Sequence, residues 1–336
     1  MNYADIIALP HDFNRDYDEV NQYVCQLISL RNKAIEHPLR VGNDFVVDIV
    51  GYDNDPDRRY PVGARPLPSF AHSSASRRLV LEMPLQTKLG FLSQVWIARV
   101  VSSDAPAPTD SDPKSDRVIL KFFQPSLLRR PYPDVPDMLS GYVPPKILAL
   151  KEDCIYRMLK SLQGLTVPYH FGIFNVTMPN GEDAHMLVIE YVEGITLKSW
   201  MTDHNGPSNE DGLCTLDTAE VSIVQNMFMS SLIGMKAIHD LGVVHGDVRE
   251  RNMIVYPPSD PTQVVFIDFA QSFMVTEDPW RPERETYRCY FLLSCCGNHS
   301  QALKAWTLEH LPEGFEDPFS LETEETEETE ETEEED

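Results

Sequence analysis

Apolar residues along the chain change their spacing near residue 193. Between 77 and 192 they form short runs separated by turn signals, which predict β-strands. These runs are RRLVLEMPL (77–85), SQVWIARVV (93–101), RVILKFF (117–123), 171–177 and 186–192. Beyond them an apolar face recurs at helical spacing over 220–239, and Gly242 stands where such a helix would stop. A sheet-rich part followed by a mainly helical part is therefore expected.

The first 76 residues are expected to be an N-terminal extension without evident chemistry. Their pattern predicts a helix over about 15–36 and a strand over 45–50 (FVVDIV). Two later stretches, 102–116 and 124–145, carry many prolines and are predicted to be exposed loops.

The chain is strongly acidic, with a formal net charge of -25. Residues 322–336 hold eleven acidic residues and no basic one, so the remainder still carries -14. This balance argues against a nucleic acid or an anionic membrane as partner. The tail, 318–336, is expected to be disordered, either as a solubilising segment or as a docking segment for a basic partner.

Targeting and redox signals are few. The six cysteines include no Cys-x-x-Cys pair, which argues against a zinc site. The first twenty residues lack the basic start and apolar run of a signal peptide, and no run reaches the about 18 apolar residues of a membrane span. We expect a soluble intracellular protein without a membrane span, in the cytoplasm or the nucleus.

The strongest chemical signal is the polar loop HGDVRERN (245–252), which follows the predicted helix stop. Sixteen residues after Asn252 an apolar run ends in Asp268. Transfer of a γ-phosphoryl group needs a carboxylate near the attacking hydroxyl and oxygen ligands for magnesium. Asp247 fits the first role, and Asn252 and Asp268, at the mouths of two neighbouring strands, fit the second.

HGDVRERN resembles the catalytic loop of the protein kinase superfamily, and IDFA resembles its Asp-Phe-Gly motif. The resemblance covers about residues 80–275. It implies an α+β, protein-kinase-like two-lobed fold. The N-lobe, 77–192, would be a small antiparallel β-sheet with one helix, and a truncated, mainly helical C-lobe would occupy 193–317. ATP and Mg²⁺ would be bound, and the acceptor would be a hydroxyl of a protein Ser or Thr or of a small molecule.

Further kinase elements lie upstream in the expected order. VILK, with Lys121, is similar to the Val-Ala-Ile-Lys strand whose lysine holds the α- and β-phosphates. Glu152, in a helix predicted at about 146–163, would pair with that lysine, and Glu82 and Asp153 are poorer candidates. The stretch MLVIEYVEG resembles the hinge, where Glu190, Tyr191 and Val192 would offer backbone groups to adenine.

The chain also departs from the family pattern. The glycine-rich loop is reduced to residues 89–95, in which Gly90 and Val95 are the candidate nucleotide contacts. Gly246 replaces the arginine that neutralises a phosphorylated activation loop, and Ala270 replaces the glycine of Asp-Phe-Gly. No Ala-Pro-Glu follows, and only 68 residues remain after Asp268.

Three functions fit these residues. In an active protein-kinase-like enzyme, Asp247 would act on the acceptor hydroxyl and Arg249 would supply charge to the γ-phosphate. A pseudokinase that binds nucleotide as a scaffold is favoured by the poor glycine loop and by Ala270. A small-molecule phosphotransferase of the aminoglycoside or choline kinase type is favoured by the His-Gly-Asp sequence and the short C-terminal part.

Overall fold

The computed structural model describes most of the chain, in two compact units. One comprises residues 1–164 and 168–191, and the other comprises 165–167 and 192–336. The described residues are 2–7, 17–52, 61–102, 116–128, 142–204, 218–278, 281–294 and 300–313. Most of the two predicted proline-bearing loops and the whole acidic tail lie outside them.

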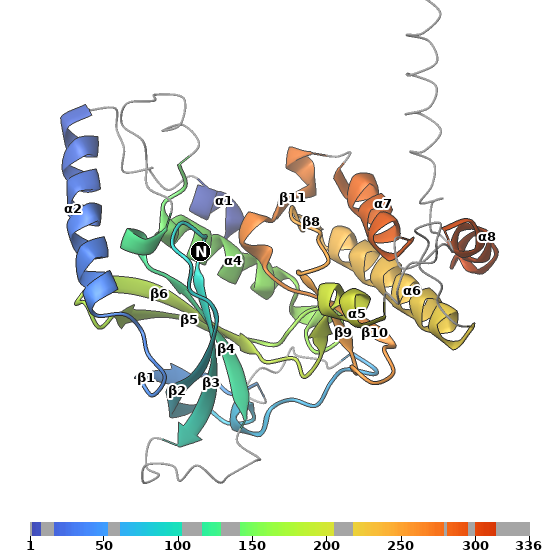
Figure 1. Ribbon diagram of the computed structural model, residues 1–336, viewed down its shortest axis with the longest axis horizontal. Coiled ribbons are helices and arrows are strands. Elements are labelled where there is room, and N and C mark those ends of the chain that lie inside the picture. The colour runs from blue at the N-terminus through green and yellow to red at the C-terminus, as the bar shows by residue number, and fades with distance from the viewer. Residues whose placement is uncertain are drawn as a thin grey trace, which may run out of the picture. The chain divides into compact units, whose positions relative to one another are not determined.

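The first unit is built on a six-stranded antiparallel sheet, ordered β1-β2-β3-β4-β6-β5 (Figure 1). Its strands are β1 (Asp44–Ile49), β2 (Ala75–Gln86), β3 (Gln94–Ser102), β4 (Arg117–Phe123), β5 (His170–Thr177) and β6 (Asp183–Glu190). Each run predicted as a strand forms one, although β6 begins three residues earlier than predicted. The region set apart as an extension supplies β1 at one edge of this sheet.

Alternation along these strands places their apolar residues in one core. The core is made of residues from the central strands together with aromatic residues from before and after them: Tyr52, Phe70, Leu79, Leu81, Trp96, Val118, Leu120, Phe122, Phe171 and Val188. The helix α4 (Pro145–Met158) packs against β4, β5 and β6, and it is the one α-helix in the described part of 77–192. It ends earlier than predicted because Leu159 leaves helical geometry at ψ 18°. Two further helices, α1 (Tyr3–Ile7) and α2 (Tyr17–Glu36), precede the sheet.

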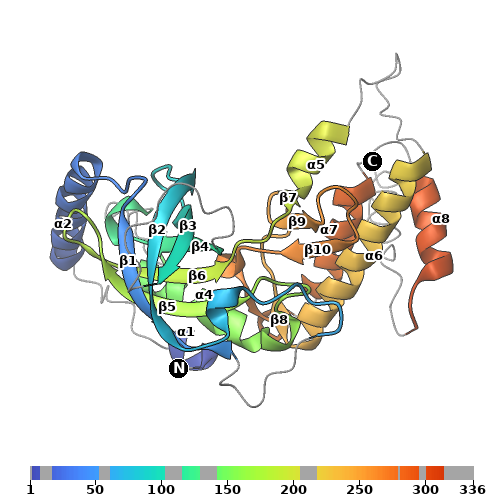
Figure 2. The same cartoon turned by 90° about the horizontal axis from the view of Figure 1, so that it is seen from below.

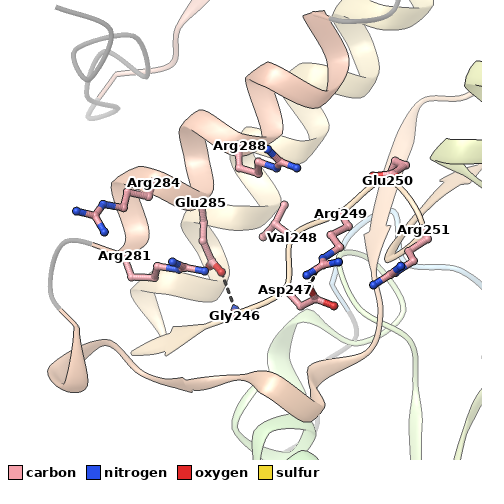
Figure 3. Close-up of a pocket in the computed structure, with 10 residues that line it drawn as sticks. All are labelled: Gly246, Asp247, Val248, Arg249, Glu250, Arg251, Arg281, Arg284, Glu285 and Arg288. Atoms are coloured by element: carbon pink, nitrogen blue, oxygen red, sulfur yellow. Dashed lines mark hydrogen bonds and ion pairs between the residues drawn. The ribbon is translucent and has the colours of Figure 1, made fainter. Parts of the chain in front are cut away.

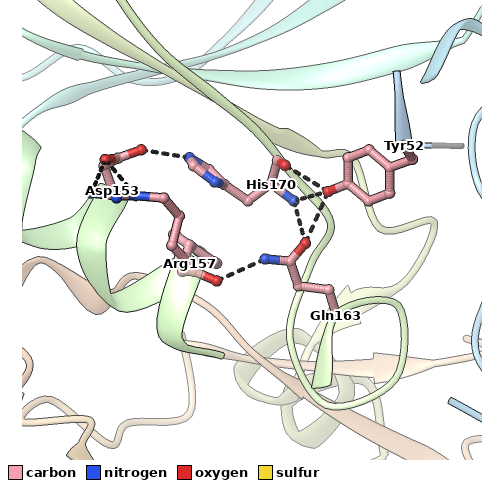
Figure 4. A network of polar contacts seen from close by, with 6 residues as sticks. Tyr52, Asp153, Arg157, Gln163 and His170 are labelled. Atoms are coloured by element: carbon pink, nitrogen blue, oxygen red, sulfur yellow. Dashed lines mark hydrogen bonds and ion pairs between the residues drawn. The ribbon is translucent and has the colours of Figure 1, made fainter. Parts of the chain in front are cut away.

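A buried polar network joins the end of α4 to the start of β5 (Figure 4). The His170 N–H donates to the Tyr52 hydroxyl at 2.9 Å, and that hydroxyl donates to Gln163 Oε1 at 2.9 Å. Asp153 on α4 contacts Arg157 and His170. Burial raises the pKa of the Asp153 carboxyl, and the Arg157 guanidinium opposes that rise. These contacts give the network a structural role.

The second unit is mainly helical (Figure 2). Its helices are α5 (Leu197–His204), α6 (Thr218–Asp240), α7 (Arg281–Ser294) and α8 (Ser300–His310). Its strands form a three-stranded sheet, β10-β9-β7, and a pair, β11-β8. They are β7 (Ile195–Thr196), β8 (Val243–Val244), β9 (Met253–Tyr256), β10 (Gln263–Phe266) and β11 (Phe273–Met274). Short 3₁₀ helices occur in both units: η2 (Ser69–Ala71), η3 (Pro125–Leu127) and η4 (Lys160–Leu162) in the first, and η5 (Phe269–Gln271) and η6 (Val275–Glu277) in the second.

The helix α6 is the predicted long helix, and it packs against β8, β10, α7 and α8. Its buried face includes Phe228, Leu232, Met235 and Ile238. Among the described residues, its segment Val221–Asp240 alone is long and apolar enough to be a candidate membrane span, with a mean hydropathy of 1.2. A packed core helix passes the same test, so this is weak evidence for a span.

Candidate active site

The first unit brings together the predicted lysine and glutamate. Lys121 lies on β4, opposite Val95 on β3 and Leu187 on β6. Its Nζ atom is 2.9 Å from Glu152 Oε1 and 2.7 Å from Oε2. Both side chains are buried, and that of Glu152 has no exposed surface. A buried charge is tolerated only when it is paired in this way.

The two alternative partners of Lys121 are engaged elsewhere. Asp153 is turned by about 100° from Glu152 around the α-helix, and it pairs with Arg157 at 2.8 Å. Glu82 pairs with Arg117 at 3.1 Å, and also with Arg99. Of these three carboxylates, Glu152 is the one that pairs with Lys121, and the role of the pair in nucleotide binding stays a prediction.

The shortened glycine turn has one geometric feature that bears on nucleotide binding. Gly90 has a φ of 83° and its backbone N–H donates to the Leu127 carbonyl at 3.0 Å. That amide is therefore already occupied by a protein acceptor. Val95, at the start of β3, is the member of this segment that lies opposite Lys121.

The end of β6 is fixed by an ion pair that the sequence did not indicate. The Glu190 carboxylate accepts from Arg65 Nε and Nη2, both at 2.8 Å, and from the Tyr169 N–H at 2.9 Å. The backbone N–H of Glu190 donates to the Tyr169 carbonyl. The next residue, Tyr191, is half-buried. After it, the Val192 carbonyl accepts from the Gly194 N–H at 2.8 Å. Arg65 belongs to the region in which no chemistry was expected.

In the second unit, the His245 side chain links the 245–252 loop to the end of β10. Its buried ring places Nε2 3.0 Å from the Ile267 carbonyl, and its Nδ1 accepts from the Asp247 N–H at 3.3 Å. Burial lowers the pKa of His245, although the carboxylates of Glu285, Asp268 and Asp247 act in the opposite direction. A neutral ring that donates through Nε2 and accepts through Nδ1 satisfies both contacts.

Asn252 and Arg249 orient the Asp247 carboxylate. The Asn252 amide nitrogen donates to the Asp247 carbonyl and to Asp247 Oδ2, both at 2.9 Å. Arg249 Nε contacts the other carboxylate oxygen, Oδ1. Both amide hydrogens of Asn252 point to Asp247, so the amide oxygen of Asn252 is directed elsewhere.

Strand pairing sets Asp268 next to Asn252. In the antiparallel pair β9–β10, Met253 lies opposite Phe266, and the Ile267 N–H donates to the Asn252 carbonyl at 3.0 Å. Asp268 follows with a φ of 68°, in the left-handed region that aspartate adopts more readily than most residues. The predicted pair of oxygen donors therefore lies at the same end of one hairpin.

The donor set suits magnesium better than a transition metal. Among the described residues no group of three or more His, Cys, Asp or Glu side chains could hold a metal ion. Mg²⁺ needs fewer protein ligands, because it retains waters and takes phosphate oxygens beside one or two side chains. The amide oxygen of Asn252 and the carboxylate of Asp268 fit that requirement.

Gly246 cannot be replaced by the arginine of the kinase pattern without rearrangement. Its φ is 79°, and a Cβ atom there would lie 2.3 Å from the Gln271 carbonyl oxygen. In place of an arginine contact, Glu285 on α7 accepts from the His245 N–H at 2.9 Å. It also accepts from the Gly246 N–H at 2.6 Å (Figure 3). Burial alone would raise the pKa of Glu285, but the hydrogen bond with His239 and those from the His245 and Gly246 amides together lower it.

Comparison with known proteins finds a similarity to a protein kinase. No known protein-family profile fits the sequence. A stretch of 120 residues is 28% identical to "Probable serine/threonine-protein kinase 2" of Plasmodium falciparum. It covers 36% of this chain and 21% of that protein, so the chain spans about a fifth of the relative's length. The match supports a protein-kinase-like relationship at the level of the superfamily. The mixture of helices and antiparallel sheets is compatible with a kinase-like fold.

Proposed function

We propose that the chain is an ATP–Mg²⁺-dependent, protein-kinase-like phosphotransferase whose acceptor is a Ser or Thr hydroxyl of a protein. One observation carries the proposal: the buried Lys121–Glu152 ion pair occurs in the same chain as the oriented Asp247–Asn252 pair with Asp268 beside it. Buried ion pairs add little to stability compared with apolar residues of the same volume. Binding of a nucleotide would explain why a buried lysine and glutamate occupy these positions in place of apolar residues.

Most of the proposed nucleotide contacts belong to the first unit, whereas Val192 belongs to the second. Lys121, held in place by Glu152, would contact the α- and β-phosphates. Gly90 and Val95 would border the phosphates, and the backbone of 190–192 would meet the adenine. Positioning of ATP accounts for much of the rate in this chemistry, because the transition state is loose and needs little covalent assistance.

The second unit would act on the acceptor. Asp247 would accept a hydrogen bond from the hydroxyl and take its proton as the oxygen bonds to the γ-phosphorus. Arg249, which contacts Asp247 Oδ1, would turn to the γ-phosphate when ATP is present. Asn252 and Asp268 would hold Mg²⁺, which neutralises phosphate charge when bound. ADP leaves as the bond to the bridging oxygen breaks.

A second function has one specific observation in its favour. The Gly90 N–H is already bonded to Leu127, and the turn has no other glycine to present amides to phosphate. This would suit a pseudokinase that binds nucleotide as a scaffold and transfers phosphate slowly or not at all.

Thermal stabilisation by ATP tests the proposed site. At about 100 times Kd the ligand adds about 2.7 kcal/mol to the folded state. We expect a magnesium-dependent rise in Tm that is lost in Lys121→Met and in Asp268→Ala. Lys236→Met is the matched control, because Lys236 is exposed and pairs with Asp240 on α6.

Transfer is tested separately, with labelled ATP and a general protein acceptor, in the wild type and in Asp247→Asn. Label incorporation that Asp247→Asn abolishes would support the enzyme. A magnesium-dependent Tm rise without incorporation would favour the pseudokinase. A folded wild type without any Tm rise would refute the nucleotide site. If Lys121→Met does not fold, Asp268→Ala carries the test.

A further inference from the structure

A pocket of about 500 Å³ lies beside Asp247, entirely within the second unit (Figure 3). The loop after β8 and the first two turns of α7 form its walls. Its lining residues are Gly246, Asp247, Val248, Arg249, Glu250, Arg251, Arg281, Arg284, Glu285 and Arg288. The proposed γ-phosphate acceptor would have to reach Asp247, so the chemistry of this lining bears on acceptor choice.

The pocket is basic in a chain that is otherwise acidic. Five arginines face three carboxylates, a formal excess of two positive charges, whereas the whole chain carries -25. Three of the arginines, Arg281, Arg284 and Arg288, follow one another at i, i+3 and i+7 on α7, which places them along one side of the helix. One of the carboxylates, Glu285, is already engaged by the backbone of the loop.

The α7 arginines are not explained by internal pairing. Among the residues that the structure describes, none of the three forms an ion pair with a carboxylate, although the Arg288 guanidinium lies 5.3 Å from the centroid of the Phe291 ring. The buried Nε of Arg281 has no hydrogen-bond partner among the described residues. In Figure 3, Arg281 and Arg288 extend from α7 toward the 246–251 loop. A buried donor without a partner is costly and suits an anionic ligand.

We propose that this pocket binds the chain's own Glu-Glu-Thr segment, 322–336, and presents one of its threonine hydroxyls to Asp247. The transfer step rests on the proposed function, whereas the binding does not. The segment has eleven acidic residues and no basic one, which complements the pocket. Its threonines recur at every third position, Thr323, Thr326, Thr329 and Thr332.

Chain length and repeat both favour this occupant. The segment follows α8 in the same unit as the pocket. From residue 313 to Thr326 there are 13 residues, which reach up to about 45 Å when extended. Because a threonine flanked by glutamates recurs every three residues, a shift of register by three brings an equivalent hydroxyl to the same place.

The proposed step is balanced. The threonine Oγ bonds to the γ-phosphorus of ATP, its proton passes to Asp247, and the bond from that phosphorus to the β,γ-bridging oxygen breaks to release ADP. The product phosphothreonine carries close to two negative charges at neutral pH. Arginine pairs with phosphate as it does with carboxylate, so the product would remain a ligand of the same pocket.

Binding is tested in trans on the full chain, after its own ten tail glutamates are changed to glutamine. A fluorescent peptide of residues 318–336 is titrated and followed by anisotropy. We expect binding that weakens by up to about fivefold for each guanidinium removed in Arg281→Gln and Arg288→Gln. Lys236→Gln, which removes an equal charge outside the pocket, should leave Kd unchanged, and a peptide with glutamine for glutamate should not bind.

Phosphorylation is measured in the wild-type chain with Mg–ATP, by mass spectrometry of the tail. We expect a modified threonine at a rate independent of protein concentration, and a slower rate in the Arg281→Gln/Arg288→Gln double variant. Arginine-dependent peptide binding without phosphorylation would retain the docking site and refute the proposed transfer. Tail phosphorylation at an unchanged rate in the double variant would overturn the docking site and retain the transfer. Binding indifferent to the arginines, or displacement by inorganic phosphate at lower concentration than by peptide, would also overturn it.

Discussion

The close approach at Gly246 makes a quantitative prediction about stability. In Gly246→Ala the new Cβ would lie 2.3 Å from the Gln271 carbonyl oxygen, and the residue would keep a φ of 79°. The left-handed conformation costs about 1–2 kcal/mol for a residue with a Cβ, and overpacking adds about 1–3 kcal/mol. Gly242→Ala is the matched control, because Gly242 has a φ of 77° in the same unit and its Cβ would meet only Met274 Cε at 3.5 Å.

The difference between the two variants isolates the steric term. With an m-value of about 2 kcal/mol/M, urea unfolding should show a midpoint about 0.5–1.5 M lower for Gly246→Ala than for Gly242→Ala. Gly246→Arg, which restores the arginine of the kinase pattern, should be at least as unstable as Gly246→Ala. Equal midpoints for the two alanine variants would refute the argument, because the strain would then be the whole effect and the Gln271 contact would be irrelevant.

Three further predictions concern buried groups. Because the pKa of Glu285 is lowered from its ordinary value of 4.5, its ionisation stabilises the fold above that pH and ceases to do so as the pH falls through the folded-state value. The urea midpoints of wild type and Glu285→Gln should therefore differ most near neutral pH and converge in acid. Lys121→Met should lower the unfolding free energy by about 3–5 kcal/mol, and adding Glu152→Gln should recover part of it, as measured by a double-mutant cycle. In alkylation followed by mass spectrometry, the exposed Cys25 should react in the folded protein, whereas Cys289, whose pKa burial raises, should react only after unfolding.

The sequence was most informative where a site depends on neighbouring elements. Two short apolar runs separated by a turn predict the hairpin of β9 and β10. Asn252 precedes the first strand and Asp268 follows the second, so antiparallel pairing places both residues at the open end of the hairpin. The choice of Glu152 over Asp153 was harder, because adjacent helix positions face different directions. In the structure Lys121 pairs with Glu152, whereas Asp153 contacts Arg157 and His170.

Interactions between distant segments were not predictable in this way. The Arg65–Glu190 pair joins residues 125 positions apart, and no periodicity marks either of them. The sequence pattern predicted the strand at 45–50 but placed it in an N-terminal extension. Its pairing with β2 depends on the path of the intervening chain, which the pattern does not give. That the three arginines of α7 line one pocket with the 246–251 loop could be seen only in the structure, because it depends on how the helix packs against that loop.

Gly246 stands where the kinase pattern has an arginine, and this difference changes how the 245–252 loop is kept in place. In the kinase pattern the arginine neutralises a phosphorylated segment. Here two backbone N–H groups donate to Glu285, whose lowered pKa keeps it ionised near neutral pH. Asn252 orients Asp247 from the other side. The order of the loop therefore follows from contacts within one unit that need no modification, and the positive charge near Asp247 comes instead from α7 and the loop arginines, as an acidic acceptor would require.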